Sequence, residues 1–148
     1  PNHPQMRQVR RLLNGNTLIC ASSNHIVLEV NPAKEIVWKY EVPFPYLAKR
    51  LENGNTLISS GEGAGKNGDY LIEVDKEGKT IWKYGGEGAP KEEKLKWPAG
   101  FDLRPDGTIY VSEAHGAQIR VISPDRKTSR IIKSPALKHA ATIVVVAE

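Results

Sequence analysis

Hydrophobic and polar residues alternate in short runs along this chain, and no apolar pattern of helical period continues over ten residues. In the second third of the chain the runs are 47–51, 56–60, 70–74 and 80–84. They are rich in β-branched and aromatic residues, and Gly, Asn, Asp or Pro bounds each of them. The pattern predicts an all-β protein of short antiparallel strands.

The same succession of runs occurs three times. Asn14-Gly15-Asn16-Thr17-Leu18-Ile19 returns as Asn53-Gly54-Asn55-Thr56-Leu57-Ile58, and in altered form as Asp106-Gly107-Thr108-Ile109-Tyr110. A repeated unit of about 40–50 residues, built of four strands and tight turns, is typical of a β-propeller blade. We therefore predict one propeller domain over 1–148, with blades at about 7–42, 45–84 and 98–133. Asn-Gly and Asp-Gly pairs predict two-residue type I′ hairpin turns between the first two strands of the blades.

The repeat also resembles known propeller families. Residues 74–84, Val-Asp-Lys-Glu-Gly-Lys-Thr-Ile-Trp-Lys-Tyr, are similar to the pyrroloquinoline-quinone-type (quinoprotein-like) repeat, and residues 31–40 repeat them with the tryptophan kept. The Arg-Leu-x-Asn-Gly-Asn-Thr-Leu pattern resembles arylsulfotransferase-like propellers, and 23–30 resembles NHL-like blades. These resemblances imply the fold, with Trp38 and Trp82 packed where neighbouring blades meet. They imply no quinone cofactor, because the vicinal cysteine pair of such sites is missing and Cys20 is the single cysteine.

One end of the predicted propeller carries all the long loops. The loop after each second strand and the connections between blades share this end, which we call the loop face, and the insertions at 61–69 and 85–97 fall on it. Long loops on a rigid scaffold are where binding sites usually lie. The candidate binding residues are Asn24, His25, Glu62, Lys66, Asn67, Asp69, Trp97, Glu113 and His115. His25 and His115 are expected at roughly matching loop positions, with Glu62 near the match, and whether a metal binds there is left open.

The motifs for catalysis are incomplete. The run 61–67 lacks the spacing and the Ser or Thr of a phosphate-binding loop, and the glycine pattern at 63–68 precedes a strand rather than a helix. The sequence therefore favours a non-catalytic binding or scaffold propeller without a cofactor. One alternative is an arylsulfotransferase-like or lyase-like enzyme that uses His25 or His115 as a base or ligand. Another is a carbohydrate-binding propeller with Tyr46 and Trp97 as stacking platforms.

Composition narrows the range of partners. The net charge is +4 and the basic residues are scattered, so nucleic-acid binding is not expected. No apolar run reaches the 18–20 residues or so of a membrane span. The compartment is left open, with secretion or export to the periplasm after removal of a signal segment as one option.

Three blades do not close a ring, because propellers contain about four to eight. We expect either self-association, as a homodimer that closes the propeller, or a longer polypeptide that supplies further blades. The apolar run 140–147 is expected to be a closing strand.

Overall fold

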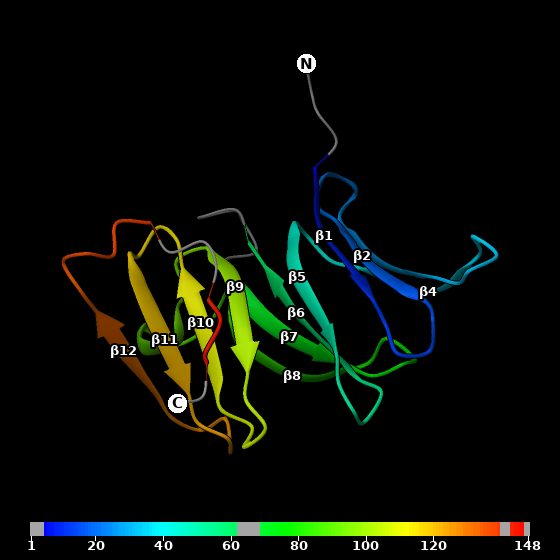
Figure 1. The fold of residues 1–148 in the computed structure, drawn as a ribbon. Coiled ribbons are helices and arrows are strands. Elements are labelled where there is room, and N and C mark those ends of the chain that lie inside the picture. The colour runs from blue at the N-terminus through cyan, green and yellow to red at the C-terminus, as the bar shows by residue number, and fades with distance from the viewer. Residues whose placement is uncertain (1–4, 62–68, 140–142, 147–148) are drawn as a thin grey trace.

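The computed structural model describes residues 5–61, 69–139 and 143–146, which form three four-stranded antiparallel sheets placed side by side like a fan (Figure 1). Blade one comprises β1 (Met6–Arg11), β2 (Thr17–Ala21), β3 (Ile26–Val30) and β4 (Ile36–Glu41). Blade two comprises β5 (Pro45–Arg50), β6 (Thr56–Ser60), β7 (Tyr70–Val74) and β8 (Thr80–Gly85). Blade three comprises β9 (Pro98–Leu103), β10 (Ile109–Glu113), β11 (Gln118–Ile122) and β12 (Ser129–Lys133). Two 3-10 turns, η1 (Ser22–Asn24) and η2 (Lys91–Glu93), are the only helical segments described.

The all-β prediction is confirmed, and the arrangement is that of part of a β-propeller. Each sheet keeps its strands in chain order, so a blade is a simple meander. The registers of the blades coincide: Arg11 lies opposite Thr17, Arg50 opposite Thr56, and Leu103 opposite Ile109. This correspondence makes it possible to compare equivalent positions in the three blades.

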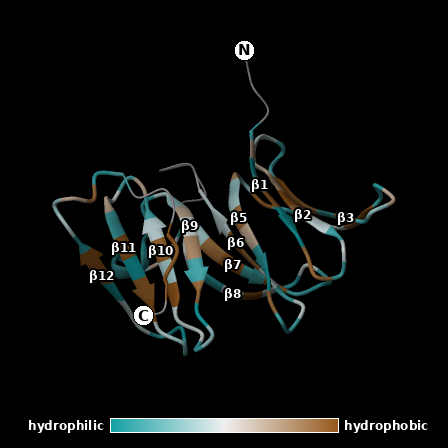
Figure 2. Ribbon diagram, in the orientation of Figure 1, coloured by the Kyte–Doolittle hydropathy of each residue, from teal (hydrophilic) through white to brown (hydrophobic). Residues whose placement is uncertain are grey.

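Two apolar layers hold the blades together. Leu18, Cys20 and Val27 of blade one pack against Ala48 and Ile72 of blade two. On the other side of blade two, residues such as Leu57 and Leu71 meet blade three through Phe101 and Val111. Hydrophobic colour accordingly runs along strands of all three sheets in Figure 2. Burial raises the pKa of the Cys20 thiol to about 12, so this cysteine behaves as a packing residue.

The tight turns differ from the predicted type. Gly54 has a positive φ of 86°, but Asn53 does not, and the Gly54 N–H donates to the Leu51 carbonyl (3.0 Å). The Leu51 N–H donates in turn to the Asn55 carbonyl (2.8 Å). This is a type I turn with a glycine bulge, and the prediction of a two-residue type I′ turn is wrong. The longer loop lets the Asn53 side chain accept a hydrogen bond from the Asn55 N–H (3.0 Å).

The predicted closing strand at 140–147 is not formed in its described part. Residues 143–146 are irregular, and they attach to blade three through side chains. The Val145 N–H donates to Asp102 (2.9 Å), and its carbonyl accepts from Arg104 (2.6 Å). These two charged side chains satisfy the backbone groups that a neighbouring strand would otherwise pair with. The described residues include no helix long and apolar enough to cross a bilayer.

Candidate functional site

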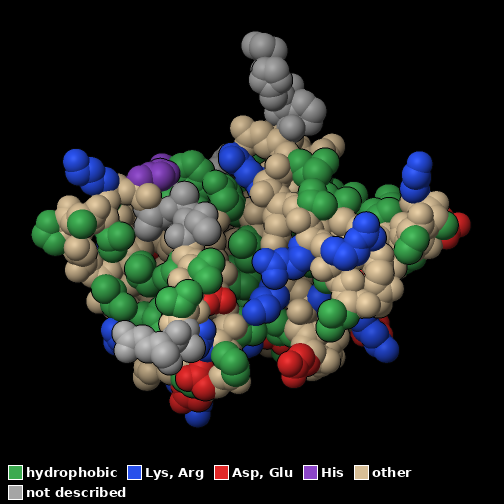
Figure 3. Space-filling view, viewed as in Figure 1, with side chains coloured by type: hydrophobic (Ala, Val, Ile, Leu, Met, Phe, Trp, Pro, Cys, Tyr) green, Lys and Arg blue, Asp and Glu red, His purple; other side chains and the backbone are tan. Residues whose placement is uncertain are grey.

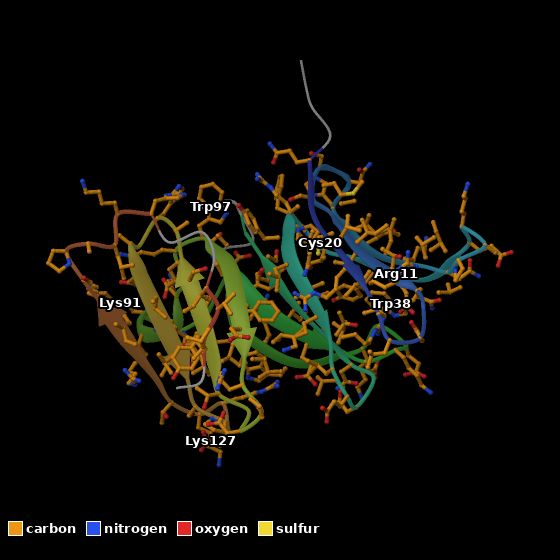
Figure 4. All side chains as sticks on the ribbon, in the orientation of Figure 1. Arg11, Cys20, Trp38, Lys91, Trp97 and Lys127 are labelled. Carbon is orange, nitrogen blue, oxygen red and sulfur yellow. The ribbon has the colours of Figure 1, made fainter. Side chains whose placement is uncertain are left out.

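The loop face and the turn face lie at opposite ends of the blades. Because neighbouring strands are antiparallel, the loop after each second strand and the connections between blades meet at one end. Figure 4 shows Trp97 at this end and Lys127, in the turn between β11 and β12, at the other.

An aromatic residue in the left-handed region begins the second and third blades. Phe44 (φ +43°) precedes Pro45 of β5, and Trp97 (φ +59°) precedes Pro98 of β9. The Phe44 carbonyl accepts from the Gly61 N–H (3.2 Å), and the Trp97 carbonyl accepts from the Ala114 N–H (2.9 Å). A bulky residue with positive φ is an outlier that the surrounding structure must enforce. These hydrogen bonds anchor the backbone of both aromatic residues.

The preceding blade supplies the second anchor of each aromatic residue. The Phe44 N–H donates to Nδ1 of His25 (3.2 Å), and the Trp97 N–H donates to Oδ2 of Asp69 (2.6 Å). His25 directly precedes β3 and Asp69 directly precedes β7, so these two residues are equivalent. In blade three, Ala117 directly precedes β11, so His115 lies two residues before the position equivalent to His25, in the same loop. The ring of His25 packs edge-on against Phe44, with centroids 4.3 Å apart.

Trp97 is the centre of a row of side chains, most of them rings, to which all three blades contribute. Arg7 of β1 lies over the ring of Tyr46 in β5, 4.8 Å from its centroid. Tyr46 meets Trp97 edge-on at 6.2 Å, and Trp97 meets the exposed His115 at 4.4 Å. His139, which follows blade three, lies 6.0 Å from Trp97 and completes what we call the aromatic row. Histidine side chains are visible together at the upper edge of Figure 3.

The indole of Trp97 has an unsatisfied donor. Its Nε1 is covered from solvent and has no hydrogen-bond acceptor among the residues that the structure describes. A covered polar group without a partner costs free energy, on the order of 1–3 kcal/mol. A ligand on the surface of the row would therefore meet the indole ring rather than this N–H.

Glu113 is buried behind this row, and its carboxylate is bound by neighbouring groups of the protein. Its carboxylate is fully buried and accepts from the Lys96 N–H (2.9 Å), Gln118 (3.0 Å) and Nε of Arg120 (2.8 Å). The Arg120 guanidinium also donates to the carbonyls of Glu92 (2.7 Å) and Lys94 (3.2 Å). This network ties the connection between blades two and three to β10 and β11, and so supports Trp97 from below.

The predicted site residues thus fall into separate groups. Trp97 and His115 lie together at the surface, with Asp69 and Glu113 buried behind them, whereas His25 contacts Phe44 and Asn24 is an exposed residue of η1. Glu62, Lys66 and Asn67 lie outside the described residues. Sequence reasoning did not find Arg7 or His139. No local motif marks His139, because it follows the last strand and reaches the row only through the fold.

The row is suited to binding a ring by stacking, with polar groups at its edge. In the described part of the chain, no three His, Cys, Asp or Glu side chains gather in a way that could hold a metal ion. Lysine and arginine side chains gather over β1 and β5 in Figure 3. The exposed Arg7 lies at the loop-face end of β1, against Tyr46 of the row. The surroundings therefore favour a ligand that carries negative charge.

Comparison with known proteins adds the fold class. No protein-family model matches the chain, and no curated protein matches it in sequence. Among solved structures, it is similar to a streptogramin B lyase, with TM-score 0.64 and 15% identity over 91% of this chain and 43% of that one. It is also similar to virginiamycin B lyase from Staphylococcus aureus (0.62, 18% identity, 93% and 44%) and to Kuenenia stuttgartiensis hydrazine synthase (0.71, 18%, 96% and 39%).

These likenesses concern the fold alone, because the identities are so low. They agree with the three-sheet arrangement in placing the chain among propeller-like proteins. The chain spans less than half the length of these solved chains.

Proposed function

We propose that this chain is a non-catalytic binding segment of a β-propeller, and that its ligand is a negatively charged ring-shaped molecule such as an acidic saccharide. The observation that carries the proposal is the aromatic row, in which Tyr46 and Trp97 lie next to each other at the loop face. Aromatic side chains of this kind combine apolar area with a polar edge, which suits binding of sugar rings. Arg7 at one end of the row offers a partner for a carboxylate or sulfate.

Trp97 can be tested with a substitution that keeps an aromatic ring at the same position. Phe44 occupies the equivalent position in blade two, so a phenyl ring fits this backbone conformation. The substitution Trp97→Phe therefore keeps a ring and removes only the N–H and part of the stacking area.

The test is a glycan array that includes uronic and sulfated sugars with their neutral counterparts, followed by titration calorimetry of any hit. We expect binding of acidic sugars that Trp97→Phe weakens about three- to fivefold, since part of the stacking area of the indole, worth about 0.5–1 kcal/mol, is lost. Tyr46→Ala should weaken binding in the same way, while Tyr46→Phe keeps it. Absence of binding on the array, or an affinity that neither Trp97→Phe nor Tyr46→Ala changes, would contradict the proposal.

A further inference from the structure

At the junction of blades one and two, Arg50 of blade two contacts both Glu29 and Trp38 of blade one. We call such a contact of an arginine with an acid and an indole of the preceding blade a clamp. Arg50, at the end of β5, donates through Nη1 to the Gly54 carbonyl of its own turn (3.1 Å). Its Nη2 pairs with Oε2 of Glu29 at 2.5 Å, and the guanidinium lies 4.6 Å from the ring centroid of Trp38. Burial alone raises the pKa of Glu29, but hydrogen bonds from Asn16 and Asn14 and the charge of Arg50 outweigh this, and the pKa is lowered.

The second blade junction repeats this clamp with a different cation. Glu73 and Trp82 are the equivalents of Glu29 and Trp38, since each acid lies directly opposite its indole in the register. Arg126 pairs with Glu73 and lies 4.5 Å from the Trp82 ring centroid. It comes from the turn between β11 and β12, because β9 has Leu103 at the register position of Arg50.

Arg11 is the equivalent of Arg50 in blade one, and it makes the same hydrogen bond to its own turn. Its Nη1 donates to the Gly15 carbonyl of its own turn at 2.6 Å. Among the residues that the structure describes, no carboxylate pairs with it. The side of blade one that faces away from blade two, which we call its open side, thus has the arginine of a clamp without the acid and the indole.

Apolar side chains on the same side of blade one as Arg11 are more exposed than their equivalents in the other blades. Val9 is 59% exposed, whereas Ala48 and Phe101 at the equivalent positions are 0% and 5% exposed. Ile19 and Leu28 are half-buried, although Ile58 and Ile72, their equivalents in blade two, are buried. This side of blade one has the composition of a blade interface and lacks a neighbour in the described chain.

A second copy of this chain does not offer the matching surface. The open side of blade three has Val121 where blade two has Glu73, and Arg130 where blade two has Trp82. Head-to-tail contact would therefore place Arg130 near Arg11, with like charges opposed. Both acid–indole pairs at the described junctions already bind a cation, and Trp97, the third of three tryptophans, lies at the loop face.

We propose that the open side of blade one receives a further four-stranded blade, absent from these 148 residues, with a carboxylate on its third strand and an indole on its fourth. The lengths agree with this, because the chain covers 43% and 44% of the two lyase chains that share its fold. The sequence predicts closure of the propeller either by further blades of a longer polypeptide or by a homodimer. Further blades could supply an acid and an indole for Arg11, whereas a second copy of this chain would not. The inference is independent of the proposed ligand.

The test adds the missing blade from the chain's own sequence. A copy of residues 5–44 is placed ahead of Met6, which reproduces the spacing between Arg11 and Arg50 and brings a copied Glu29 and Trp38 to Arg11. We expect the urea midpoint to rise by about 1 M or more, because the added blade buries an apolar face. Arg11→Ala should then lower the midpoint of the extended protein and leave that of the parent almost unchanged.

The matched control is the same extended protein with Glu29→Gln and Trp38→Ala in the added blade only. A second readout is the rate at which peroxide oxidises Met6, which is 62% exposed and should be protected in the extended protein once the added copy carries Met6→Leu. The proposal is overturned if the midpoint does not rise and Met6 stays reactive, or if the control blade stabilises equally. It is also overturned if light scattering shows that the parent is a dimer which Arg11→Ala dissociates.

Discussion

Replacement of Arg50 by alanine tests whether the clamp between blades one and two stabilises the fold. The substitution removes the partner of Glu29, whose side chain is only 9% exposed, and it uncovers the ring of Trp38. The change leaves the apolar layer of Ala48 and Ile72 in place. It therefore isolates the electrostatic part of the junction.

The magnitude follows from the two contacts that are lost. Removing one partner of a charged hydrogen bond and leaving the other largely buried costs about 1–3 kcal/mol. Loss of the cation–π contact, at 4.6 Å and partly exposed, adds about 0.5–1 kcal/mol. We expect a total loss of about 2–3 kcal/mol, or a urea midpoint lower by about 1 M for a domain of this size.

Arg11→Ala is the matched control, because Arg11 has the same register position and the same bond to its turn without an acid or an indole. Urea unfolding followed by circular dichroism should show a shift for Arg11→Ala of only about 0.5 kcal/mol, typical of surface substitutions. Equal shifts for the two variants would refute the clamp as a source of stability, since the turn bond that both share would then account for the effect.

Two further predictions concern the same junctions. The pKa of Glu73 is lowered because hydrogen bonds from Asn55 and Arg126 outweigh the effect of burial, so its contribution to stability is present above the ordinary pKa of 4.5 and is lost as the pH falls through and below that value. Glu73→Gln should therefore flatten the decline in urea midpoint between about pH 6 and pH 3, and a decline as steep as that of the parent would count against the assignment. Phe101→Ala should cost about 3–5 kcal/mol in chemical denaturation because the ring is buried between blades two and three, whereas Val9→Ala, at the equivalent exposed position, should cost less than about 0.5 kcal/mol. Similar losses for these two variants would mean that the layer between the blades is not packed as described.

Much of the fold could be predicted, because the sequence features that determine strands and turns lie within short segments. Alternation in runs such as 70–74 sets strand and face, and the recurrence of Asn-Gly-Asn-Thr-Leu-Ile sets the repeat. Trp38 was placed correctly at a blade junction, where its indole donates to the Lys76 carbonyl of the next blade (3.0 Å). The turn type predicted from the sequence is wrong, because the choice depends on one extra residue in the loop that composition alone does not reveal.

The candidate site was predicted less well. Their place in long loops predicts Trp97 and His115 as site residues, and both lie in the aromatic row. The same reasoning predicts Glu113, yet its side chain is buried and pairs with Arg120. A polar residue at the end of a strand can face either the solvent or the neighbouring blade, and only the packing of that neighbour decides between them.

By itself, the sequence of this protein determined its class of structure: short strands, tight turns and three blades of one kind, each encoded within its own stretch of residues. Only the tertiary structure decided which side chains from different blades meet, as Arg7, Tyr46 and Trp97 do, and which acid a given arginine pairs with. The physical reason is that strand and turn preferences act over a few neighbouring residues, whereas the aromatic row and the clamps depend on the angle and distance between separate sheets.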